Sequence, residues 1–333
     1  MPIINTNDYN VYLDISDDFN VVLTTFTSKD VSNLDQFIDN FSVPDENSII
    51  ILWGAVNRIY PDHQIIQLNE FYNSIKNPLV VFTGILDLTK SNFLDFHWQG
   101  INLFQHIAKI SQPQNRLIVF KKSKKYLFMS SKDYLSRRYI LQHLLNNGFE
   151  NQGVIAYKCL QKLFNEPFGD NIKYIKDACE SINTQIPIVG FDGPLPNYDK
   201  VPEDIINDTY LSIITETYYQ GPIYFSEKIY YAMLYNHFFI YLGPTNSLKY
   251  LRSLGFKTFG HIVDESYDDI YDPAERLFAV TKSMDEFISK PLSEIEQLYA
   301  ENIDIINHNR QLISKIDINE TINSALRFAI SIR

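Results

Sequence analysis

The chain has 333 residues, of which 45% are hydrophobic and 14% aromatic, with only 12 Gly and 14 Pro. This composition predicts a fully folded protein with a large core, divided into two domains because single cores stop growing near ~250–300 residues. Its 29 basic and 40 acidic residues give a net charge of −11, which argues against a general polyanion binder but leaves room for a local basic patch.

The cysteines and the N-terminal segment indicate in which cellular compartment we expect the protein. Cys159 and Cys179 are the only cysteines, so neither a disulfide framework nor a paired-cysteine zinc site is expected. The start of the chain lacks a basic region followed by an apolar segment, and no run of about 18 apolar residues occurs. We therefore expect a soluble cytoplasmic protein.

The first third of the chain alternates short apolar strands with amphipathic helices. Strands are predicted at Asn20–Phe26, Ser48–Gly54, Leu79–Leu86 and Arg116–Lys121, and helices at Leu34–Phe41, Asn69–Ile75 and Phe93–Ile110. Short apolar runs that alternate with helices are typical of a parallel sheet covered on both faces. Residues 1–122 are therefore expected to form a Rossmann-like domain.

A basic segment follows, with eight Lys and Arg residues: Arg116, Lys121, Lys122, Lys124, Lys125, Lys132, Arg137 and Arg138. The part from Lys121 to Lys125 lies between two strand-like runs. It is interpreted as a solvated hairpin or interdomain turn, because runs of charge usually face water. A phosphate-facing role for the segment stays open.

The alternation of strands and helices then resumes, with a strand at Tyr126–Ser130 and a helix from Arg137 that Gly148 ends in a left-handed conformation. The later elements are strands at Ile186–Val189, Leu211–Glu216 and Phe238–Leu242, and helices at Asn171–Ile182, from Ser226, and at Asn246–Leu254, Asp272–Ile288, Ser293–Ile316 and Glu320–Ile332. A second Rossmann-like domain is expected over 123–290. Residues 291–333 are expected to be C-terminal helices that can pack back on the N-terminal domain.

Several strong motifs are missing. The chain has no G-x-G-x-x-G, no Walker A loop, no G-x-S-x-G and no H-E-x-x-H. The seven histidines show no close metal-ligand spacing, and the acidic run from Asp264 to Asp269 fits a solvated loop and helix cap. No metal cofactor is expected.

The candidate site consists of charged residues at strand ends and helix starts. In open α/β sheets, ligands bind beyond the carboxyl ends of the strands, often with a phosphate at a helix N-terminus. A lysine in a first helical turn, such as Lys228, is unfavourable unless it is solvated or an anion is bound beside it. A diphosphate held by Arg137, Lys228 and backbone N–H groups explains both cations, and a plain surface lysine is the alternative. The full set of residues predicted to line this ligand-binding site is Arg137, Arg138, Thr215, Glu216, Ser226, Glu227 and Lys228.

Glu227 allows two interpretations. A carboxylate in the first turn complements the helix dipole, which contributes ~0.3–1 kcal/mol without any ligand. An acidic residue can equally accept both hydroxyls of a ribose, as in dinucleotide sites. The pattern leaves both open.

One segment resembles a known family. The stretch IITETYYQGPIYFSEKIYYAMLYNHFFIYLGP, from Ile213 to Pro244, is similar to the donor-binding core of the α1,3-fucosyltransferase-type glycosyltransferases. That core has an acidic strand end, a variable loop, a Thr/Ser-Glu-Lys helix start and an apolar strand that ends near Gly or Pro. The continuation from Leu248 to Leu277 is similar to a variant common among phage and viral glycosyltransferase-like proteins. The resemblance covers residues 126 to 280 and departs from the family at Thr217, where Asn is typical.

The resemblance implies a GT-B fold, in which two Rossmann-like domains face a cleft. It implies a nucleotide-diphosphate sugar of the UDP or GDP type as donor substrate, with no further cofactor. Lys228 and Arg137 would bind the diphosphate, and Glu227 would bind the ribose. If the sugar is inverted, a general base must activate the acceptor hydroxyl. GT-B geometry places this base in the N-terminal domain, where Asp87, Asp95 and His97 are the candidates.

Three functions stay open. The first is sugar transfer to a glycan or small hydroxyl acceptor, which fits the acidic net charge. The second is a phage-type enzyme that glycosylates hydroxymethylated pyrimidines in DNA, and it would bind DNA through the basic region from Lys121 to Arg138. The third is a non-catalytic GT-B-like binding or scaffold protein.

Overall fold

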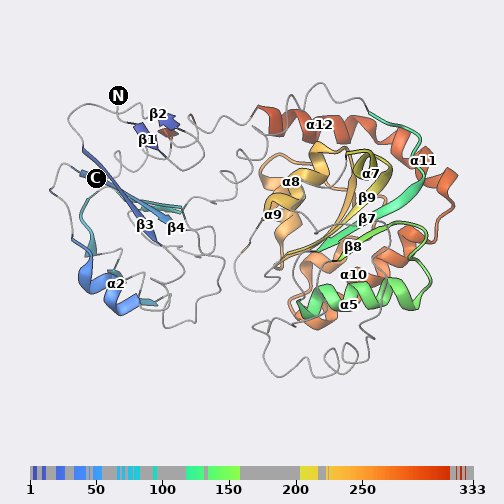
Figure 1. Cartoon of the computed structure of the whole chain (residues 1–333), viewed down its shortest axis with the longest axis horizontal. Coiled ribbons are helices and arrows are strands. Elements are labelled where there is room, and N and C mark those ends of the chain that lie inside the picture. The colour runs from blue at the N-terminus through green and yellow to red at the C-terminus, as the bar shows by residue number, and fades with distance from the viewer. Residues whose placement is uncertain are drawn as a thin grey trace. The chain divides into compact units, whose positions relative to one another are not determined.

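The computed structural model describes residues 3–5, 10–12, 20–26, 34–42, 45, 48–54, 66–67, 70–71, 74–77, 79–82, 93–95, 118–130, 134–157, 203–216, 223, 225–315, 320, 323–324 and 327. The chain divides into two compact units, Met1–Lys109 with Ile316–Arg333, and Ile110–Lys315 (Figure 1). Both units contain a parallel sheet with helices, as the sequence predicts. The predicted domain bounds and the facing domains of a GT-B fold stay predictions.

The first unit is built on a parallel sheet with the strand order β3-β4-β5-β6. The strands are β3 (Asn20–Phe26), β4 (Ser48–Gly54), β5 (Leu79–Phe82) and β6 (Phe93–Asp95), with α2 (Leu34–Asn40) between β3 and β4 in the chain. The bounds of β3 and β4 are those predicted, because long runs of β-branched and apolar residues favour buried parallel strands. A short antiparallel pair, β1 (Ile3–Asn5) and β2 (Asn10–Tyr12), is an addition to the prediction.

β6 corrects one prediction. The pattern predicts a helix from Phe93 to Ile110, but Phe93–Asp95 is a strand that pairs in parallel with Leu79–Val81. A short apolar run does not distinguish a strand from the start of a buried helix. Pairing with β5, whose residues lie 14 positions earlier in the chain, makes this segment a strand. The rest of the predicted helix lies outside the described residues.

The second unit is a parallel sheet with the order β10-β9-β7-β8 (Figure 1). In chain order its elements are β7 (Lys124–Ser130), α5 (Leu135–Asn146), β8 (Val154–Tyr157), α7 (Glu203–Asn207), β9 (Thr209–Thr215), α8 (Glu227–Leu234), β10 (Phe238–Leu242) and α9 (Ser247–Ser253). Every residue of β9 and of β10 is buried, as expected for central strands covered on both faces.

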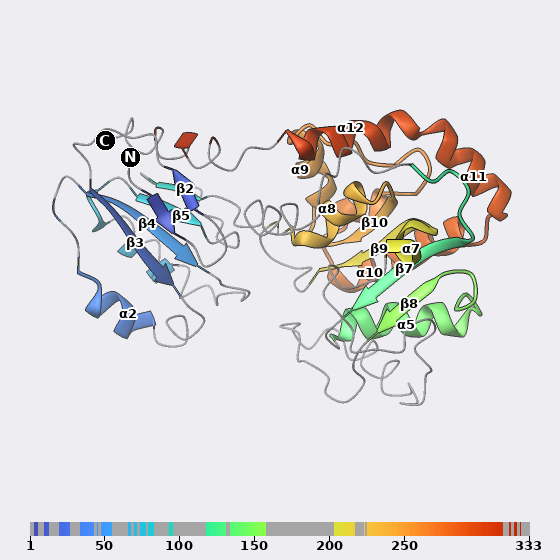
Figure 2. The same cartoon turned by 45° about the horizontal axis from the view of Figure 1, so that its top comes forward.

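The connections of this sheet run in opposite directions from its centre. The chain passes from β7 through α5 to β8 at one edge, and from β9 through α8 to β10 at the other. Right-handed crossovers in opposite directions place their helices on opposite faces. Accordingly, α8 packs with α12 (Ile303–Ser314) on one face, and α5 packs with α10 (Pro273–Ile288) on the other (Figures 1 and 2). The reversal between β7 and β9 is a topological switch point.

The C-terminal helices pack on this second sheet. Residues 293–316 are predicted as one helical stretch, but Asn302 separates α11 (Leu292–Glu301) from α12. α10 begins after Asp272, whose side chain accepts the backbone N–H groups of Ala274 and Glu275 at 2.9 Å each. Within the described residues, no helix has the length and apolar character that crossing a membrane requires.

The segment before β7 corrects two further predictions. The described part of the predicted strand Arg116–Lys121 is not a strand, and the carbonyl of Phe120 accepts a hydrogen bond from the Tyr210 hydroxyl at 2.8 Å. Lys121–Lys125 is not a solvated hairpin, because β7 begins at Lys124 inside the sheet and Lys122 is only 4% exposed.

Lys122 is a buried cation. Its Nζ donates to the carbonyl oxygen of Thr209 at 2.8 Å and lies 4.8 Å from the centre of the Tyr299 ring. Burial lowers the pKa of this ammonium to about 7, although the charge of Asp208 acts in the opposite direction. Tyr299 comes from α11, so Lys122 connects the start of the sheet to a C-terminal helix.

We expect the free energy of unfolding to rise between pH 7 and about pH 10 because of Lys122. Over this range the unfolded chain keeps the proton that the folded chain releases, with a slope of at most ~1.4 kcal/mol per pH unit. Below pH 7 Lys122 is protonated in both the folded and the unfolded chain, so the full cost of burying its charge lowers the free energy of unfolding. Lys122→Met should therefore remove this slope, so that its stability relative to wild type falls as the pH rises.

Urea unfolding at pH 6, 8 and 10 measures this slope. Lys282→Met is the matched control, because the Lys282 side chain is 74% exposed and should leave the pH dependence unchanged. Parallel stability curves for wild type and Lys122→Met would contradict the expectation.

Candidate functional site

The predicted site residues of the second unit gather at the carboxyl ends of its strands. β9 ends at Thr215 and is followed by Glu216, and α8 begins after Ser226. Arg137 lies in the first turn of α5, which follows β7. Because β7 and β9 flank the switch point, these residues lie at the edge where open α/β sheets bind ligands.

Glu216 is the centre of this cluster. Its side chain is fully buried, and its Oε1 accepts the backbone N–H of Ser226 at 2.9 Å and the Ser226 hydroxyl at 2.7 Å. The Tyr241 hydroxyl, from β10, donates to the same oxygen at 3.3 Å. A buried carboxylate is costly unless such donors surround it, so Glu216 ties the start of α8 to both β9 and β10.

Lys228 completes the cluster. Its Nζ donates to Ser226 Oγ at 2.8 Å and to Glu216 Oε2 at 3.4 Å, and it lies 3.6 Å from Glu227 Oε1. Ser226 is the N-cap, as predicted, and its Oγ also accepts the Lys228 backbone N–H at 3.4 Å. The unfavourable placement of a lysine at a helix start is thus offset by a buried carboxylate.

Arg137 reaches the same strand end from the other side of the switch point. Its side chain is buried, with 2% exposure, and its Nη2 donates to the Thr215 carbonyl oxygen at 3.3 Å. Its Cζ lies over the Tyr134 ring, 4.8 Å from the ring centroid. Two consecutive residues at the end of β9 therefore each hold a cation from a different helix. Arg138, the next residue of α5, is half-buried.

The start of α9 is closed by the protein itself. Asp268, in the short helix η4 (Ser266–Asp269), accepts the backbone N–H groups of Leu248 and Lys249 at 3.0 Å each. Burial raises the pKa of this carboxyl, and the two N–H groups oppose that effect. The acidic run predicted as a helix cap is therefore a cap. In the part of the chain that the structure describes, no three His, Cys, Asp or Glu side chains are placed to hold a metal ion.

The basic region from Lys121 to Arg138 uses several of its cations internally. Lys122, Lys124, Lys125 and Arg137 each donate to a protein acceptor: Thr209 O for Lys122, Asn151 O for Lys124, Gln152 Oε1 and Ile288 O for Lys125, and Thr215 O for Arg137. Lys121 is exposed, and Lys132 lies outside the described residues. Charge density along the sequence therefore overstates the basic surface here.

The predicted catalytic residues belong to the first unit. Asp95 is the last residue of β6, where it pairs with Val81. Asp87 and His97 lie outside the described residues. A role for these three as general base stays a prediction.

Sequence reasoning missed two aromatic members of the cluster, Tyr241 and Tyr134. Tyr241 occupies an ordinary buried strand position, and Tyr134 directly precedes α5. Nothing in the local pattern marks either residue, because their partners Glu216 and Arg137 come from other elements.

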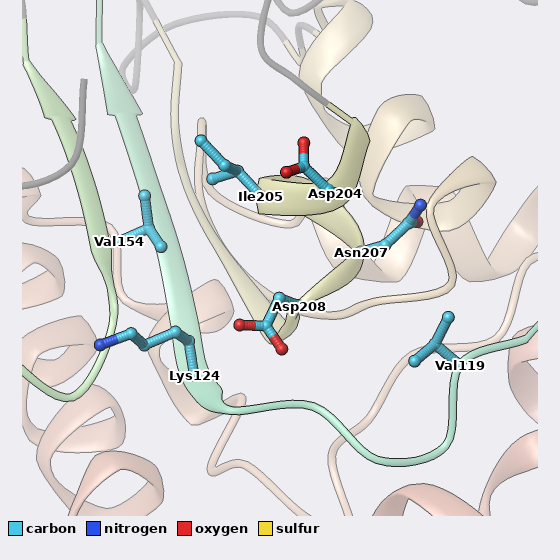
Figure 3. Close-up of a pocket in the computed structure, with 7 residues that line it drawn as sticks. All are labelled: Val119, Lys124, Val154, Asp204, Ile205, Asn207 and Asp208. Carbon is cyan, nitrogen blue, oxygen red and sulfur yellow. The ribbon is translucent and has the colours of Figure 1, made fainter. Parts of the chain in front are cut away.

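A cavity of about 650 Å³ lies at the opposite edge of the sheet, where the strands begin (Figure 3). Its lining residues are Val119 in the segment before β7, Lys124 and Val154 at the starts of β7 and β8, Asp204, Ile205 and Asn207 of α7, and Asp208 between α7 and β9. Asp208 is held by Ser123, whose backbone N–H donates at 2.7 Å. None of the predicted site residues that the structure describes lines this cavity.

Comparison with known proteins adds little. No protein-family model matches the chain, and neither does any curated protein. Two solved structures are similar. An α1,3-fucosyltransferase with GDP-fucose has 13% identity and a TM-score of 0.29, over 96% of this chain and 78% of that chain. A second α1,3-fucosyltransferase structure has 9% identity and a TM-score of 0.29, over 89% and 93%. A TM-score of 0.29 is too low to establish a shared fold or a shared function for this chain.

Proposed function

We propose that the protein is a glycosyltransferase that uses a nucleotide-diphosphate sugar as donor. One observation carries the proposal: Arg137 and Lys228, from helices on opposite faces of the sheet, converge on the consecutive residues Thr215 and Glu216 at the switch point. A doubly charged group such as a diphosphate is the ligand that two cations and a helix N-terminus suit best.

These groups match the chemistry of the leaving group. When the bond to the sugar breaks, negative charge develops on the donor's terminal phosphate, and cations already in place stabilise it without reorganisation. Arg137 is held rigidly between Thr215 and the Tyr134 ring, and Lys228 is held by Ser226 and Glu216. Such preorganisation favours the transition state over the ground state.

Glu227 is the residue we assign to the ribose. Its side chain is 33% exposed, unlike the fully buried Glu216, so its carboxylate can reach a ligand outside the helix. Its position directly before Lys228 places it one residue from the proposed diphosphate contact. The sequence resemblance to the α1,3-fucosyltransferase type supports this order of roles, the GT-B arrangement and a base among Asp87, Asp95 and His97.

The two other functions have less support. A DNA glycosyltransferase of the phage type needs a basic surface, and much of the Lys121–Arg138 charge is engaged by Thr209, Gln152 and other internal acceptors. A scaffold protein would explain the burial of Glu216. It would also explain the Glu216–Lys228 pair, but not why Arg137, from a separate helix, is brought to the same strand end.

The proposal predicts that a nucleoside diphosphate stabilises the protein. A thermal-shift panel of UDP, GDP and CMP with their sugars tests this. At a concentration of about 100 Kd, the matching nucleotide should stabilise the fold by ~2.7 kcal/mol. The protein should also hydrolyse the corresponding nucleotide sugar slowly when no acceptor is present. No shift and no hydrolysis with any UDP or GDP compound would overturn the proposal and support the scaffold function.

A further inference from the structure

Glu216 is a buried charge inside the proposed donor site. Its side chain has 0% exposure, so no atom of a donor can touch it in this structure. The sequence predicts Glu216 as a donor-binding residue, which requires a direct contact. Its burial therefore calls for a different role in the same site.

The two carboxylate oxygens of Glu216 accept hydrogen bonds from different groups. Oε1 accepts from the backbone and hydroxyl of Ser226 and from the Tyr241 hydroxyl. Oε2 faces Lys228 Nζ at 3.4 Å. One oxygen thus holds the start of α8 in place, while the other attracts the ammonium group of the residue two positions into the helix.

The lysine ammonium has three N–H donors. Ser226 Oγ at 2.8 Å and Glu216 Oε2 at 3.4 Å account for two of them. Glu227 Oε1, at 3.6 Å, is beyond hydrogen-bond distance, and 14% of the Lys228 side chain is exposed. The two inner contacts therefore fix the direction in which the third N–H points.

We propose that Glu216 is a positioning residue that aims Lys228 Nζ at the diphosphate of the donor and makes no contact with the donor itself. This proposal rests on the function proposed above. The serine hydroxyl, the carboxylate and the ammonium form one hydrogen-bonded unit, because Ser226 Oγ donates to Glu216 and accepts from Lys228. Removing the carboxylate's charge removes the attraction that keeps the ammonium in this direction.

Glu216→Gln is the test variant, because it keeps the size of the side chain and an oxygen for Ser226 but removes the charge. Its amide also presents N–H groups to Lys228, which repel the ammonium. We expect the Kd of the matching nucleoside diphosphate, measured by titration calorimetry, to rise at least ~10-fold. Glu216→Asp, which keeps the charge but is one methylene shorter, should recover part of the affinity and gives a second measurement if the Gln variant does not fold.

A double-mutant cycle separates positioning from a purely structural role. In a Lys228→Met background, Glu216→Gln should have no further effect on the Kd, because the group that it positions is already gone. Glu265→Gln is the matched control. Glu265 also accepts a backbone N–H (Phe259, 2.8 Å), a hydroxyl (Thr258, 2.7 Å) and an arginine (Arg252, 3.0 Å), but away from this site. It should change the Kd less than ~2-fold.

The outcomes distinguish this proposal from the one on which it rests. If the wild-type protein binds a nucleoside diphosphate and the two substitutions are additive, the positioning role of Glu216 is overturned while the function stands. If the wild-type protein binds no nucleoside diphosphate at all, both proposals fall. An unchanged Kd in folded Glu216→Gln also overturns the positioning role alone.

Discussion

Lys228→Ala should lower kcat/KM at least ~10–100-fold, with the fold intact. Lys228, whose side chain is 14% exposed, forms one unit with Ser226 and the fully buried Glu216, and a charge-assisted hydrogen bond to a phosphate contributes ~1.5–3 kcal/mol. Because negative charge on the leaving diphosphate increases in the transition state, we expect kcat to fall as well as affinity. Steady-state kinetics with the nucleotide sugar identified by the thermal-shift panel measures both.

Two further variants make this result specific. Arg137→Ala should also lower kcat/KM, because Arg137 supplies the second positive charge from α5; at 2% exposure it acts through its charge rather than through an exposed contact. Lys282→Ala removes an exposed lysine of α10 that pairs with Glu286, and it should leave turnover unchanged. Unchanged turnover in both Lys228→Ala and Arg137→Ala would remove the proposed donor site.

Phe238→Ala should lower the free energy of unfolding by ~3–5 kcal/mol, the largest stability effect that we expect. Phe238 begins β10 and is fully buried. Its ring packs edge-on against Phe259, Phe287 and Tyr299, with centroid distances of 4.9, 6.0 and 5.6 Å. These partners come from a loop, α10 and α11, so truncation opens a cavity where three separate segments meet the sheet.

Phe278→Ala is the matched control for this substitution. Phe278 lies on α10 with 41% exposure, and its ring lies edge-on to the Tyr139 ring with a centroid distance of 5.6 Å. Its truncation should lower the free energy of unfolding by about 1 kcal/mol, because little apolar surface becomes newly exposed. Urea unfolding midpoints of the two variants give the comparison. A loss below about 1.5 kcal/mol for Phe238→Ala would show that the aromatic cluster is not the core of this unit.

Local sequence patterns predict several elements of the second unit. The bounds of β10 follow from a continuous apolar run, and the start of α8 follows from an N-cap serine before an amphipathic stretch. Gly148, with a φ of +67°, follows α5 as predicted, and Gly255, with a φ of +90°, follows α9 in the same way. These signals are local, because hydrogen bonds within a few residues decide them.

The failures of prediction share a cause. The pattern predicts a helix where β6 lies and a solvated hairpin or interdomain turn at Lys121–Lys125, because an apolar triplet and a run of lysines are ambiguous without their neighbours. Lys122 is buried because Thr209 and Tyr299 supply a carbonyl and an aromatic face. Both partners lie more than 80 residues away in the chain, so no local pattern contains them.

For the candidate site, the sequence by itself determined the candidate residues: Arg137 and the Ser226–Lys228 helix start, from cations in first helical turns and a strand that ends in Glu216. Only the tertiary structure decided how they act together. The strand order brings β7 beside β9, so Arg137 meets Thr215, and burial turns Glu216 from a candidate ligand contact into the partner of Lys228. The physical reason is that a charge's role depends on its solvation and on its nearest opposite charge, and chain positions far apart in sequence set both.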